Sequence, residues 1–301
     1  MHFASFRVYL TNRLLFCVSA LATVVYLLSG RLTLTLNGGE LSKRPLPSCL
    51  IIGARKGGTR AMLQFLSLHP KIRIVPQEVH YFDDNATYNK GVEWYRSQMP
   101  LADQPDIMVV EKTPAYFVSS VAPERVRLLD PTMKLILVVR DPVIRTVSDY
   151  TQVMHSKLSK GKPVAGFERS VFDSAGMVRA CYKPILNSLY VVHLKRWLAY
   201  FPPNQVHIAD GDRLISQPII ELQAAERFLQ LEPKISADQL YFNRTKGFYC
   251  YRHPSQGNIC LGSTKGRLHV KISPLARARL KSFFHKYNQL FYACANRTFS
   301  W

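Results

Sequence analysis

The sequence predicts an α/β protein with a central, mostly parallel sheet and helices on both faces of that sheet. Short apolar runs typical of buried strands alternate along the chain with stretches whose apolar residues repeat at helical spacing. Two of these runs end directly in turn-forming residues, at Gly53 and at Arg140-Asp141-Pro142. Because helical crossovers join parallel strands and cover the sheet, this alternation indicates one α/β domain.

The individual elements follow from the same patterns. Buried strands are expected at residues 49–53, 72–75, 107–110, 134–139 and 205–209. Helices are expected at residues 59–68, 123–129, 142–156, 186–200, 219–229 and 274–287. Between the last two helices, residues 241–261 are rich in turns and aromatic side chains.

Composition restricts the class of protein. The 301 residues are 47% hydrophobic and 11% aromatic, which supplies enough apolar surface for a core and excludes a disordered chain. Lys and Arg number 40 against 20 Asp and Glu, so the formal net charge is +20 at pH 7. An excess of this size indicates a polyanionic partner such as nucleic acid, anionic lipid or an acidic polysaccharide.

The N-terminal region predicts passage into the secretory pathway. Residues 14–28 are apolar, and Arg7 and Arg13 precede them, which orients the rest of the chain to the lumen. We therefore predict a cytosolic tail at 1–13, a signal-anchor at 14–30, a short stem at 31–48 and one lumenal domain at 49–301. A cleaved signal peptide and a buried helix are the alternatives for the apolar segment.

Sequons and cysteines agree with a lumenal location. Glycosylation sequons begin at Asn85, Asn243 and Asn296. Cys250 and Cys260 stand ten residues apart in the turn-rich stretch, and this spacing suits a local disulfide hairpin. Paired metal-ligand spacing is missing, so no metal is expected. Cys17 and Cys49 are expected to be thiols, whereas Cys181 and Cys294 could be buried thiols or a second bridge.

A glycine-rich loop between the first strand and the first helix predicts an anion site. Gly53 and Gly58 have the spacing of a phosphate-binding loop, but Thr59 and Arg60 occupy the Lys and hydroxyl positions of that motif. The cation, Lys56, stands inside the loop. The loop therefore suits a phosphate-like group without a nucleotide-bound metal, and a plain basic turn is the alternative.

A second anion site is predicted at the end of the strongest strand. Arg140 ends this strand, and Ser148 follows about two turns into the next helix. Arg favours bidentate contact with an oxyanion, so the pair could hold a second phosphate. A surface Arg and a capping Ser would explain the same residues.

Together the two sites resemble those of the sulfotransferases, whose donor is 3′-phosphoadenosine-5′-phosphosulfate. Further stretches resemble the heparan sulfate glucosamine 3-O-sulfotransferases, and they include IIGARKGGTRA, EVHYFD, GVEWYRSQMP, EKTPAYF, YFNRTKGFYC and TKGRLH. The resemblance runs from about Cys49 to Trp301. It implies a P-loop-like sulfotransferase fold and sulfuryl transfer to the glucosamine 3-hydroxyl of heparan sulfate. The short stem and the EVHYFD context most resemble the type 1-like members, whose product binds antithrombin.

The same resemblance implies roles on the donor side. The 5′-phosphosulfate would contact Lys56, Gly57, Gly58, Thr59 and Arg60. The 3′-phosphate would contact Arg140, Ser148 and a loop made of Lys265, Gly266 and Arg267. Tyr249 or Phe248 would lie near the adenine.

On the acceptor side, the resemblance implies that Glu78 is the general base. His80 and Asp83 would orient the glucosamine, and Lys56 would stabilise the leaving group. If the EVHYFD stretch is extended, Glu78, His80 and Phe82 would share a face. The acceptor chain would also contact Arg55, Lys112, Gln152, Lys157, Lys160 and Lys162. Nearby cations at Lys56, Arg60 and Lys112 should keep Glu78 ionised.

Two other functions are weighed against this one. A P-loop kinase acting on a sugar is disfavoured by the displaced Lys and by the lack of a clear Walker B strand. A non-catalytic heparin-binding or nucleic-acid-binding module explains the charge but assigns no role to Glu78. The expected partners are a heparan sulfate chain and the Golgi membrane, without nucleic acid, and the chain is expected to be a monomer.

Overall fold

The computed structural model describes residues 43–301 apart from 103, 105, 254–256 and 263–267. The expected tail, signal-anchor and most of the stem lie outside this part. The last stem residues contact the domain, since the carbonyl oxygen of Lys43 accepts a hydrogen bond from the backbone of Ala102 at 2.9 Å and Leu46 packs against the core. Within the described part, no helix combines the length and apolarity needed to cross a bilayer.

A five-stranded sheet forms the centre, with the strand order β2-β3-β1-β4-β5. The strands are β1 (Cys49–Gly53), β2 (Ile72–Ile74), β3 (Met108–Lys112), β4 (Lys134–Val139) and β5 (Val206–Asp210). All neighbouring pairs are parallel, as the sequence predicts. From β1 the chain crosses to the edge strand β2 and comes back to β3 beside β1. It then continues on the other side of β1 with β4 and β5. Ligands bind in such sheets outside the carboxyl ends of the strands at this reversal, between β1 and β4.

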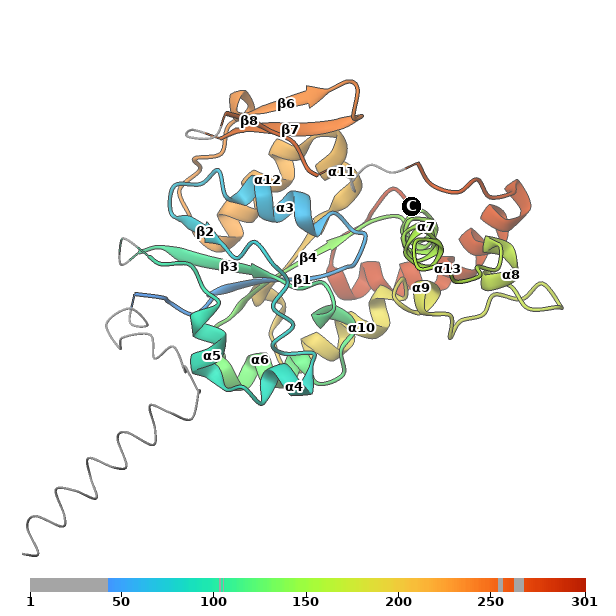
Figure 1. Cartoon of the computed structure of the whole chain (residues 1–301), viewed down its shortest axis with the longest axis horizontal. Helices are drawn as coiled ribbons and strands as arrows, with labels where there is room; N and C mark the ends of the chain where they lie inside the picture. The colour runs from blue at the N-terminus through green and yellow to red at the C-terminus, as the bar shows by residue number, and fades with distance from the viewer. Residues whose placement is uncertain (1–42, 103, 105, 254–256, 263–267) are drawn as a thin grey trace, which may run out of the picture. The chain divides into compact units, whose positions relative to one another are not determined.

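Helices cover both faces of the sheet, as Figure 1 shows. One face packs on α3 (Thr59–Leu66), α11 (Gly211–Ser216) and α12 (Pro218–Leu229). The other packs on α6 (Ala122–Leu129), α10 (Tyr190–Leu198) and the end of α13 (Pro274–Ala295). Within β1, Cys49 and Ile51 face the first layer, and Leu50 and Ile52 face the second. This alternation buries both faces of the strand.

A third apolar cluster anchors the helix that follows β4. It joins α7 (Pro142–Leu158), α8 (Phe167–Val171), α9 (Lys183–Leu186) and the first half of α13. Asp141 caps α7 by accepting a hydrogen bond from the backbone of Val143 at 2.7 Å, and Pro142 fits the first turn. Arg140 is thereby fixed at the junction of β4 and α7. Shorter elements are α4 (Asn85–Tyr88), α5 (Val92–Ser97) and 3₁₀ turns at Tyr116–Val118, Pro203–Gln205 and Ala237–Gln239.

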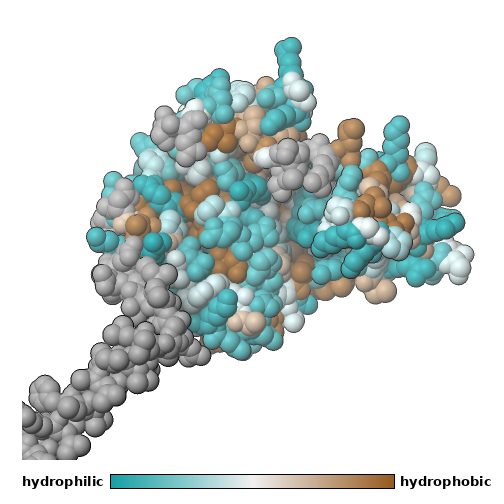
Figure 2. Space-filling model, in the orientation of Figure 1, coloured by the Kyte–Doolittle hydropathy of each residue, from teal (hydrophilic) through white to brown (hydrophobic). Residues whose placement is uncertain are grey.

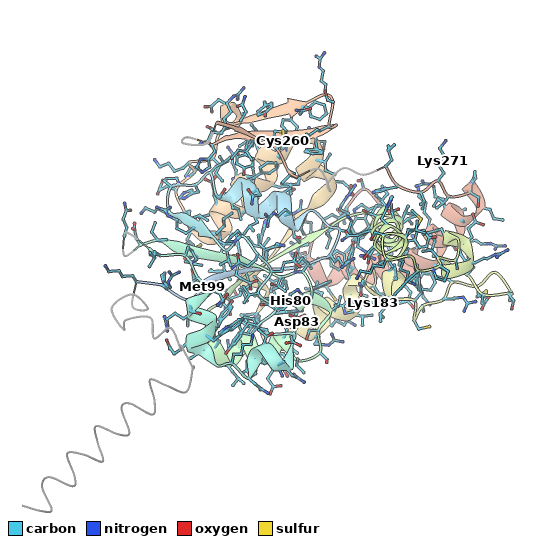
Figure 3. The ribbon with its side chains drawn as sticks, in the orientation of Figure 1. His80, Asp83, Met99, Lys183, Cys260 and Lys271 are labelled. Carbon is cyan, nitrogen blue, oxygen red and sulfur yellow. A yellow bond between two sulfur atoms is a disulfide. The ribbon has the colours of Figure 1, made fainter. Side chains whose placement is uncertain are left out.

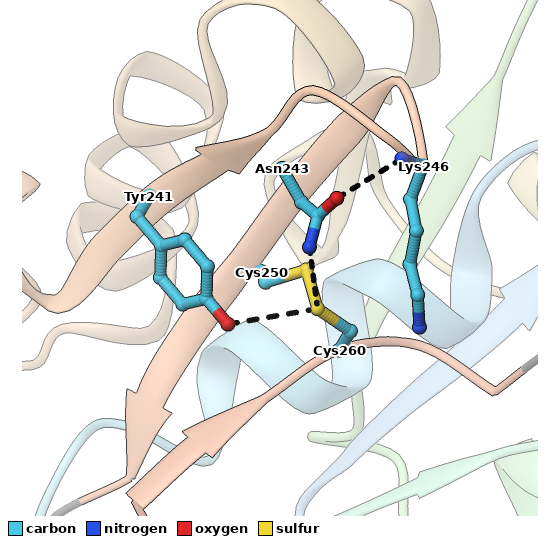
Figure 4. Close-up of a disulfide and its surroundings, with 5 residues drawn as sticks. All are labelled: Tyr241, Asn243, Lys246, Cys250 and Cys260. Atoms are coloured by element: carbon cyan, nitrogen blue, oxygen red, sulfur yellow. Dashed lines mark hydrogen bonds between the residues drawn. A yellow bond between two sulfur atoms is a disulfide. The ribbon is translucent and has the colours of Figure 1, made fainter.

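The turn-rich stretch contains a small antiparallel sheet. Its strands are β6 (Leu240–Asn243), β7 (Phe248–His253) and β8 (Gly257–Ile259). The predicted disulfide between Cys250 and Cys260 is confirmed. Figure 4 shows that the Tyr241 hydroxyl and the Asn243 amide both contact the Sγ atom of Cys260, at 3.6 and 3.8 Å. Of the remaining cysteines in the described part, Cys49, Cys181 and Cys294 are free, and Cys181 is exposed.

Two predicted helices differ from the structure. Residues 186–200 do not form one helix, because the buried Ser188 hydroxyl contacts Arg145 and Pro184 in the break between α9 and α10. The last helix extends to Ala295 instead of ending at residue 287. Its extra turns are retained because Phe291 packs into the core. Hydrophilic residues cover much of the face seen in Figure 2, and apolar residues lie in small patches among them.

Candidate active site

Glycines allow the loop between β1 and α3 to pack closely against β4 and α11. A Cβ atom added to Gly57 would lie 2.2 Å from the carbonyl oxygen of Val138. One added to Gly211 would lie 2.0 Å from the carbonyl oxygen of Gly57, so the loop fits tightly between β4 and α11. The N-terminus of α3 has no side-chain cap, which leaves its N–H groups able to bind an anion.

A cavity of about 340 Å³ lies against this loop, at the reversal point of the sheet. This volume is within the range of about 300–1,000 Å³ that is usual for small-molecule sites. The structure brings both expected anion sites to it. The lining residues that the sequence analysis named are Lys56, Gly58, Thr59, Arg60, Arg140, Ser148, Gln152 and Phe248.

The charge of the cavity is positive. No acidic residue is among the described residues that line it. Asp212 holds Arg140 in place, since its Oδ1 atom lies 2.7 Å from both Nε and Nη2 of Arg140. Partial burial, together with Arg140 and Lys56, lowers the pKa of His269. The positive charge of the cavity comes from Lys56, Arg60, Arg140 and Lys246.

The segment from Glu78 to Asp83 is a folded loop and contains no strand. His80 has φ +56°, in the left-handed region, where the chain turns. Phe82 is fully buried, whereas 43% of the Glu78 side chain is exposed. The stretch is therefore not extended, and Glu78 and Phe82 do not share a face. The left-handed backbone at His80 interrupts the alternation that an extended strand would need.

Polar contacts link the exposed side chains of this loop. His80 Nδ1 lies 3.0 Å from Asp83 Oδ2, and its Nε2 lies 3.7 Å from Glu78 Oε2. The other Glu78 oxygen accepts a hydrogen bond from Lys112, which is 3% exposed. Figure 3 shows His80 and Asp83 side by side. The Glu78 carboxylate is thus held by a buried ammonium while it stays accessible, and it can accept a proton from a bound hydroxyl.

The Glu78–Asp83 loop and the cavity lie at the same edge of the sheet. Lys112 ends β3, and Ile51 of β1 is its neighbour in the parallel register. On the other side, the Arg60 guanidinium donates a hydrogen bond to the carbonyl oxygen of Pro76. This bond ties the first turn of α3 to the segment that leads into Glu78. A ligand extending from the cavity along this edge would reach the loop.

Aromatic residues form the floor of the Glu78–Asp83 loop. Tyr81 stacks on Tyr95, with ring centroids 4.3 Å apart and an interplanar angle of 7°. Tyr81 also stacks on Trp94 at 6.4 Å, and Phe82 packs edge-on against Tyr116 at 5.3 Å. These contacts fix the loop backbone from below.

Comparisons with known proteins support one family. A family model described as a sulfotransferase domain matches residues 46–274. Heparan sulfate glucosamine 3-O-sulfotransferase 5 of Homo sapiens is 47% identical over 257 residues, which cover 85% of this chain and 74% of that protein. The chain belongs to the heparan sulfate glucosamine 3-O-sulfotransferase family. Heparan sulfate glucosamine 3-O-sulfotransferase 3A1 of Mus musculus is 42% identical over 276 residues, covering 90% of this chain and 68% of that protein.

A solved structure agrees with the fold of this family member. A sulfotransferase from Alicyclobacillus acidocaldarius superposes with a TM-score of 0.61 at 19% sequence identity, covering 84% of this chain and 97% of that one. The predicted family and the predicted sulfotransferase fold are thus confirmed. The finer expectation of a type 1-like member stays a prediction.

Other expected site residues of this sulfotransferase-family chain lie along α7. Arg55 Nε donates to Asp149 Oδ1 at 2.8 Å, and Lys56 Nζ donates to Gln152 Oε1 at 3.1 Å. Burial alone would raise the pKa of Asp149, but Arg145 and Arg55 outweigh it and the pKa is lowered. The ionised Asp149 therefore anchors Arg55. The expected acceptor contacts near the end of α7 are all exposed, namely Lys157, Lys160 and Lys162.

Of the residues expected near the adenine and the 3′-phosphate, only some are found at the cavity. Phe248 lines the cavity, whereas Tyr249 is not among the lining residues and packs edge-on against Phe242 at 5.4 Å. Successive residues of a strand point to opposite sides, which explains this difference. The expected loop residues Lys265, Gly266 and Arg267 lie outside the described residues.

The sequence analysis missed several residues that line the cavity. They are Ala61, Thr151, Ile215, Lys246, Gly247, Leu261 and His269. Lys246 and Gly247 belong to the YFNRTKGFYC stretch, so its resemblance to the family was the signal available for them. His269 ends the TKGRLH stretch, so the same signal was available for it, whereas Ile215 is brought to the cavity by tertiary packing.

The three sequons differ in their surroundings. Asn85 and Asn296 are exposed. Asn243 is half-buried, and its side chain donates to Cys260 Sγ and accepts from the backbone of Lys246 at 3.0 Å. A glycan on Asn243 would therefore be attached to the nitrogen atom that contacts Cys260 Sγ.

Proposed function

We propose that this chain transfers a sulfuryl group from 3′-phosphoadenosine-5′-phosphosulfate to the 3-hydroxyl of glucosamine residues in heparan sulfate. The observation that carries the proposal is the juxtaposition of two features at one sheet edge. One is a cationic cavity with no acid among its described lining residues, and the other is an accessible carboxylate, Glu78, held by Lys112. Kinship with proteins named for this activity supports it.

The chemistry of the cavity fits the proposed donor. The donor would supply an activated sulfuryl group on a nucleotide that carries two separate phosphate positions. Lys56, Thr59 and Arg60, with the open N-terminus of α3, would bind the 5′ side. Arg140 and Ser148 would bind the 3′-phosphate on the other side of the cavity. Gly57 contributes by leaving room where a Cβ would meet Val138.

The residues of the chain then divide the work of an in-line displacement. The acceptor O3 forms the new S–O bond as the bond from sulfur to the bridging oxygen breaks. Glu78 takes the proton of the attacking hydroxyl. Lys56 neutralises the negative charge that develops on the bridging oxygen. Positioning and electrostatics supply most of the rate in reactions of this kind, and no covalent intermediate with the chain is needed.

We infer the acceptor contacts from the same edge of the sheet. His80 and Asp83 would orient the glucosamine beside Glu78, because they lie in hydrogen-bond contact in the same loop. The charged groups along the chain of sugars would be contacted by Arg55, Lys112, Gln152, Lys157, Lys160 and Lys162.

We further propose that the domain works in the Golgi lumen as part of a single-pass type II membrane protein. The apolar segment at 14–28 supports this location, and so does the disulfide, since such bonds persist in oxidising compartments. Secretion after signal cleavage is the alternative. Exposed Asn85 and Asn296 would carry glycans, and the protein would act as a monomer that does not bind nucleic acid.

The test is a transfer assay with radiolabelled donor, heparan sulfate and no added metal, followed by disaccharide analysis. Glu78→Gln is compared with Glu93→Gln, because Glu93 is an exposed carboxylate on α5. We expect label at glucosamine O3, a loss of about 10²–10⁴-fold in kcat for Glu78→Gln, and wild-type activity for Glu93→Gln.

Each other outcome contradicts a defined part of the proposal. Label at O6 or nitrogen would reject the acceptor position. Heparin binding without transfer or nucleotide affinity would indicate a binding module. Magnesium-dependent turnover of ATP would indicate a kinase.

A further inference from the structure

Glu111 is a buried carboxyl group to which the mechanism above gives no role. It is fully buried in β3, directly before Lys112. Burial raises its pKa to about 7. A buried carboxylate is costly to retain, and apolar residues of similar size often replace buried charges without loss of stability. The contacts of Glu111 therefore suggest what it contributes.

Those contacts lead to the backbone of the Glu78–Asp83 loop. The Thr113 hydroxyl donates to Glu111 Oε1, and the same hydroxyl oxygen accepts from the backbone N–H of Val79 at 3.1 Å. A hydroxyl has one proton, so directing it toward Glu111 leaves the lone pairs of the oxygen to face the loop. Without Glu111, this hydroxyl would be free to rotate away from Val79.

A second connection passes through two tyrosines. The Tyr95 hydroxyl donates to Glu111 Oε2 at 3.4 Å, and the Tyr95 ring stacks under Tyr81. The Tyr116 hydroxyl interacts with Glu111 and accepts from the backbone N–H of Tyr81 at 3.1 Å. Val79 and Tyr81 flank His80, whose backbone is left-handed. The loop is thus fixed on both sides of its sharpest turn.

We propose that Glu111 is a positioning residue that holds the Glu78–Asp83 loop in the geometry required for proton abstraction. Glu111 acts through Thr113 and Tyr116 and does not touch the substrate. The inference rests on the proposed function, because it assigns Glu78 as the base whose position Glu111 secures. A displacement of a catalytic group by about 1 Å can cost about 10²-fold in rate, so such a support has a measurable effect.

Glu226 provides a matched control. It is 1% exposed, and its Oε1 accepts hydrogen bonds from the backbones of Lys234 and Ile235 at 2.8 and 2.9 Å. Glu226 therefore holds a backbone segment as Glu111 does, but in the connection after α12. Loss of either carboxylate should affect stability, and only loss of Glu111 should affect the loop.

The experiment compares Glu111→Leu, Glu111→Gln, Thr113→Val and Glu226→Gln by hydrogen exchange and by steady-state kinetics. For Glu111→Leu and Thr113→Val we expect at least 10-fold faster exchange of the amides of Val79 and Tyr81. We also expect kcat to fall by about 10–10²-fold, while KM for the donor stays within about twofold. Glu111→Gln should show smaller changes in both amide exchange and kcat than Glu111→Leu, because its amide oxygen can still accept a hydrogen bond from Thr113. Glu226→Gln should change neither.

The readouts separate the inference from the proposed function. Hydrogen exchange needs no substrate, so it decides the positioning role even if the wild type transfers no sulfate. Unchanged exchange of the loop amides in the folded variants would overturn the inference, and so would equal kinetic losses in Glu226→Gln. If Glu111→Leu does not fold, Glu111→Gln and Thr113→Val can still be compared with Glu226→Gln by the same two measurements.

Discussion

At the scale of single residues, Gly57 shows how little space the cavity loop leaves. In Gly57→Ala the new methyl group would lie 2.2 Å from the Val138 carbonyl oxygen, so the loop must move away from β4. We expect binding of 3′-phosphoadenosine-5′-phosphate, measured by calorimetry, to weaken by at least about 10-fold (a change of about 1.4 kcal/mol). The control is Gly166→Ala, whose added Cβ meets nothing within 4 Å. Equal affinity in both variants would contradict the proposed donor site.

A second prediction at this scale concerns Glu111 and the dependence of the free energy of unfolding on pH. Burial raises its pKa from 4.5 to about 7, so the folded protein binds more protons than the unfolded chain between these values. The contribution of Glu111 to the free energy of unfolding should therefore fall as pH rises from about 4.5 to about 7, and then level off. Urea unfolding at pH 5 and pH 8 checks this.

The comparison with Glu111→Gln isolates that contribution. The amide does not titrate, so the variant should lose less stability than the wild type between the two pH values. The same difference in both proteins would show that Glu111 does not titrate in this range.

At the scale of elements, the disulfide joins β7 to the segment after β8 beside the cavity. Phe248 of β7 lines the cavity, and Cys250 lies two residues further along the same strand. We expect Cys250→Ser/Cys260→Ser to lower the free energy of unfolding by about 2–3 kcal/mol, since the bridge closes a short loop. Binding of 3′-phosphoadenosine-5′-phosphate should weaken as well.

The control for this prediction is Cys181→Ser, which removes an exposed free thiol. It should change neither stability nor nucleotide binding. If the double variant binds the nucleotide as tightly as the wild type, then the small antiparallel sheet does not shape the cavity.

The elements also show what the sequence could predict. The parallel strands were predictable because runs such as residues 134–139 are apolar throughout and end at clear turn signals. The cationic loop followed from its glycines and its place between a strand and a helix. The fold of the Glu78–Asp83 loop could not be predicted, because its turn at His80 packs on aromatic residues that arrive from α5 and the segment after β3. The contacts of Glu111 are invisible in the sequence for the same reason.

At the scale of the whole molecule, the net charge of +20 should govern binding of the polyanionic chain. We expect Gln substitution of Lys157, Lys160 and Lys162 together to raise KM for polymeric heparan sulfate by about 10-fold. KM for a short oligosaccharide should change less than twofold if, as proposed, these side chains contact the polymer away from the reacting sugar. The elution salt on a heparin column should fall, since ionic contacts at the surface are screened by salt.

The control removes equal charge elsewhere, through Gln substitution of exposed Lys71, Lys195 and Lys234. A specific groove predicts a smaller change in KM for this control. Equal changes in the two triple variants would mean that only the total charge matters.

The stack of Tyr81 on Trp94 gives the molecule a built-in optical reporter. The chain has 3 Trp residues. Trp197 is fully buried, and Trp301 stacks on Phe299 at the C-terminus, so Trp94 is the one in contact with the Glu78–Asp83 loop. Trp94 is partly buried, and its ring contacts both Tyr81 and the ammonium of Lys90, which is 4.4 Å from the ring centroid. Indole emission responds to nearby charge and solvent, so a shift of this loop would alter the intrinsic fluorescence. Stopped-flow mixing with unlabelled oligosaccharide could therefore time the arrival of the sugar before any chemistry occurs.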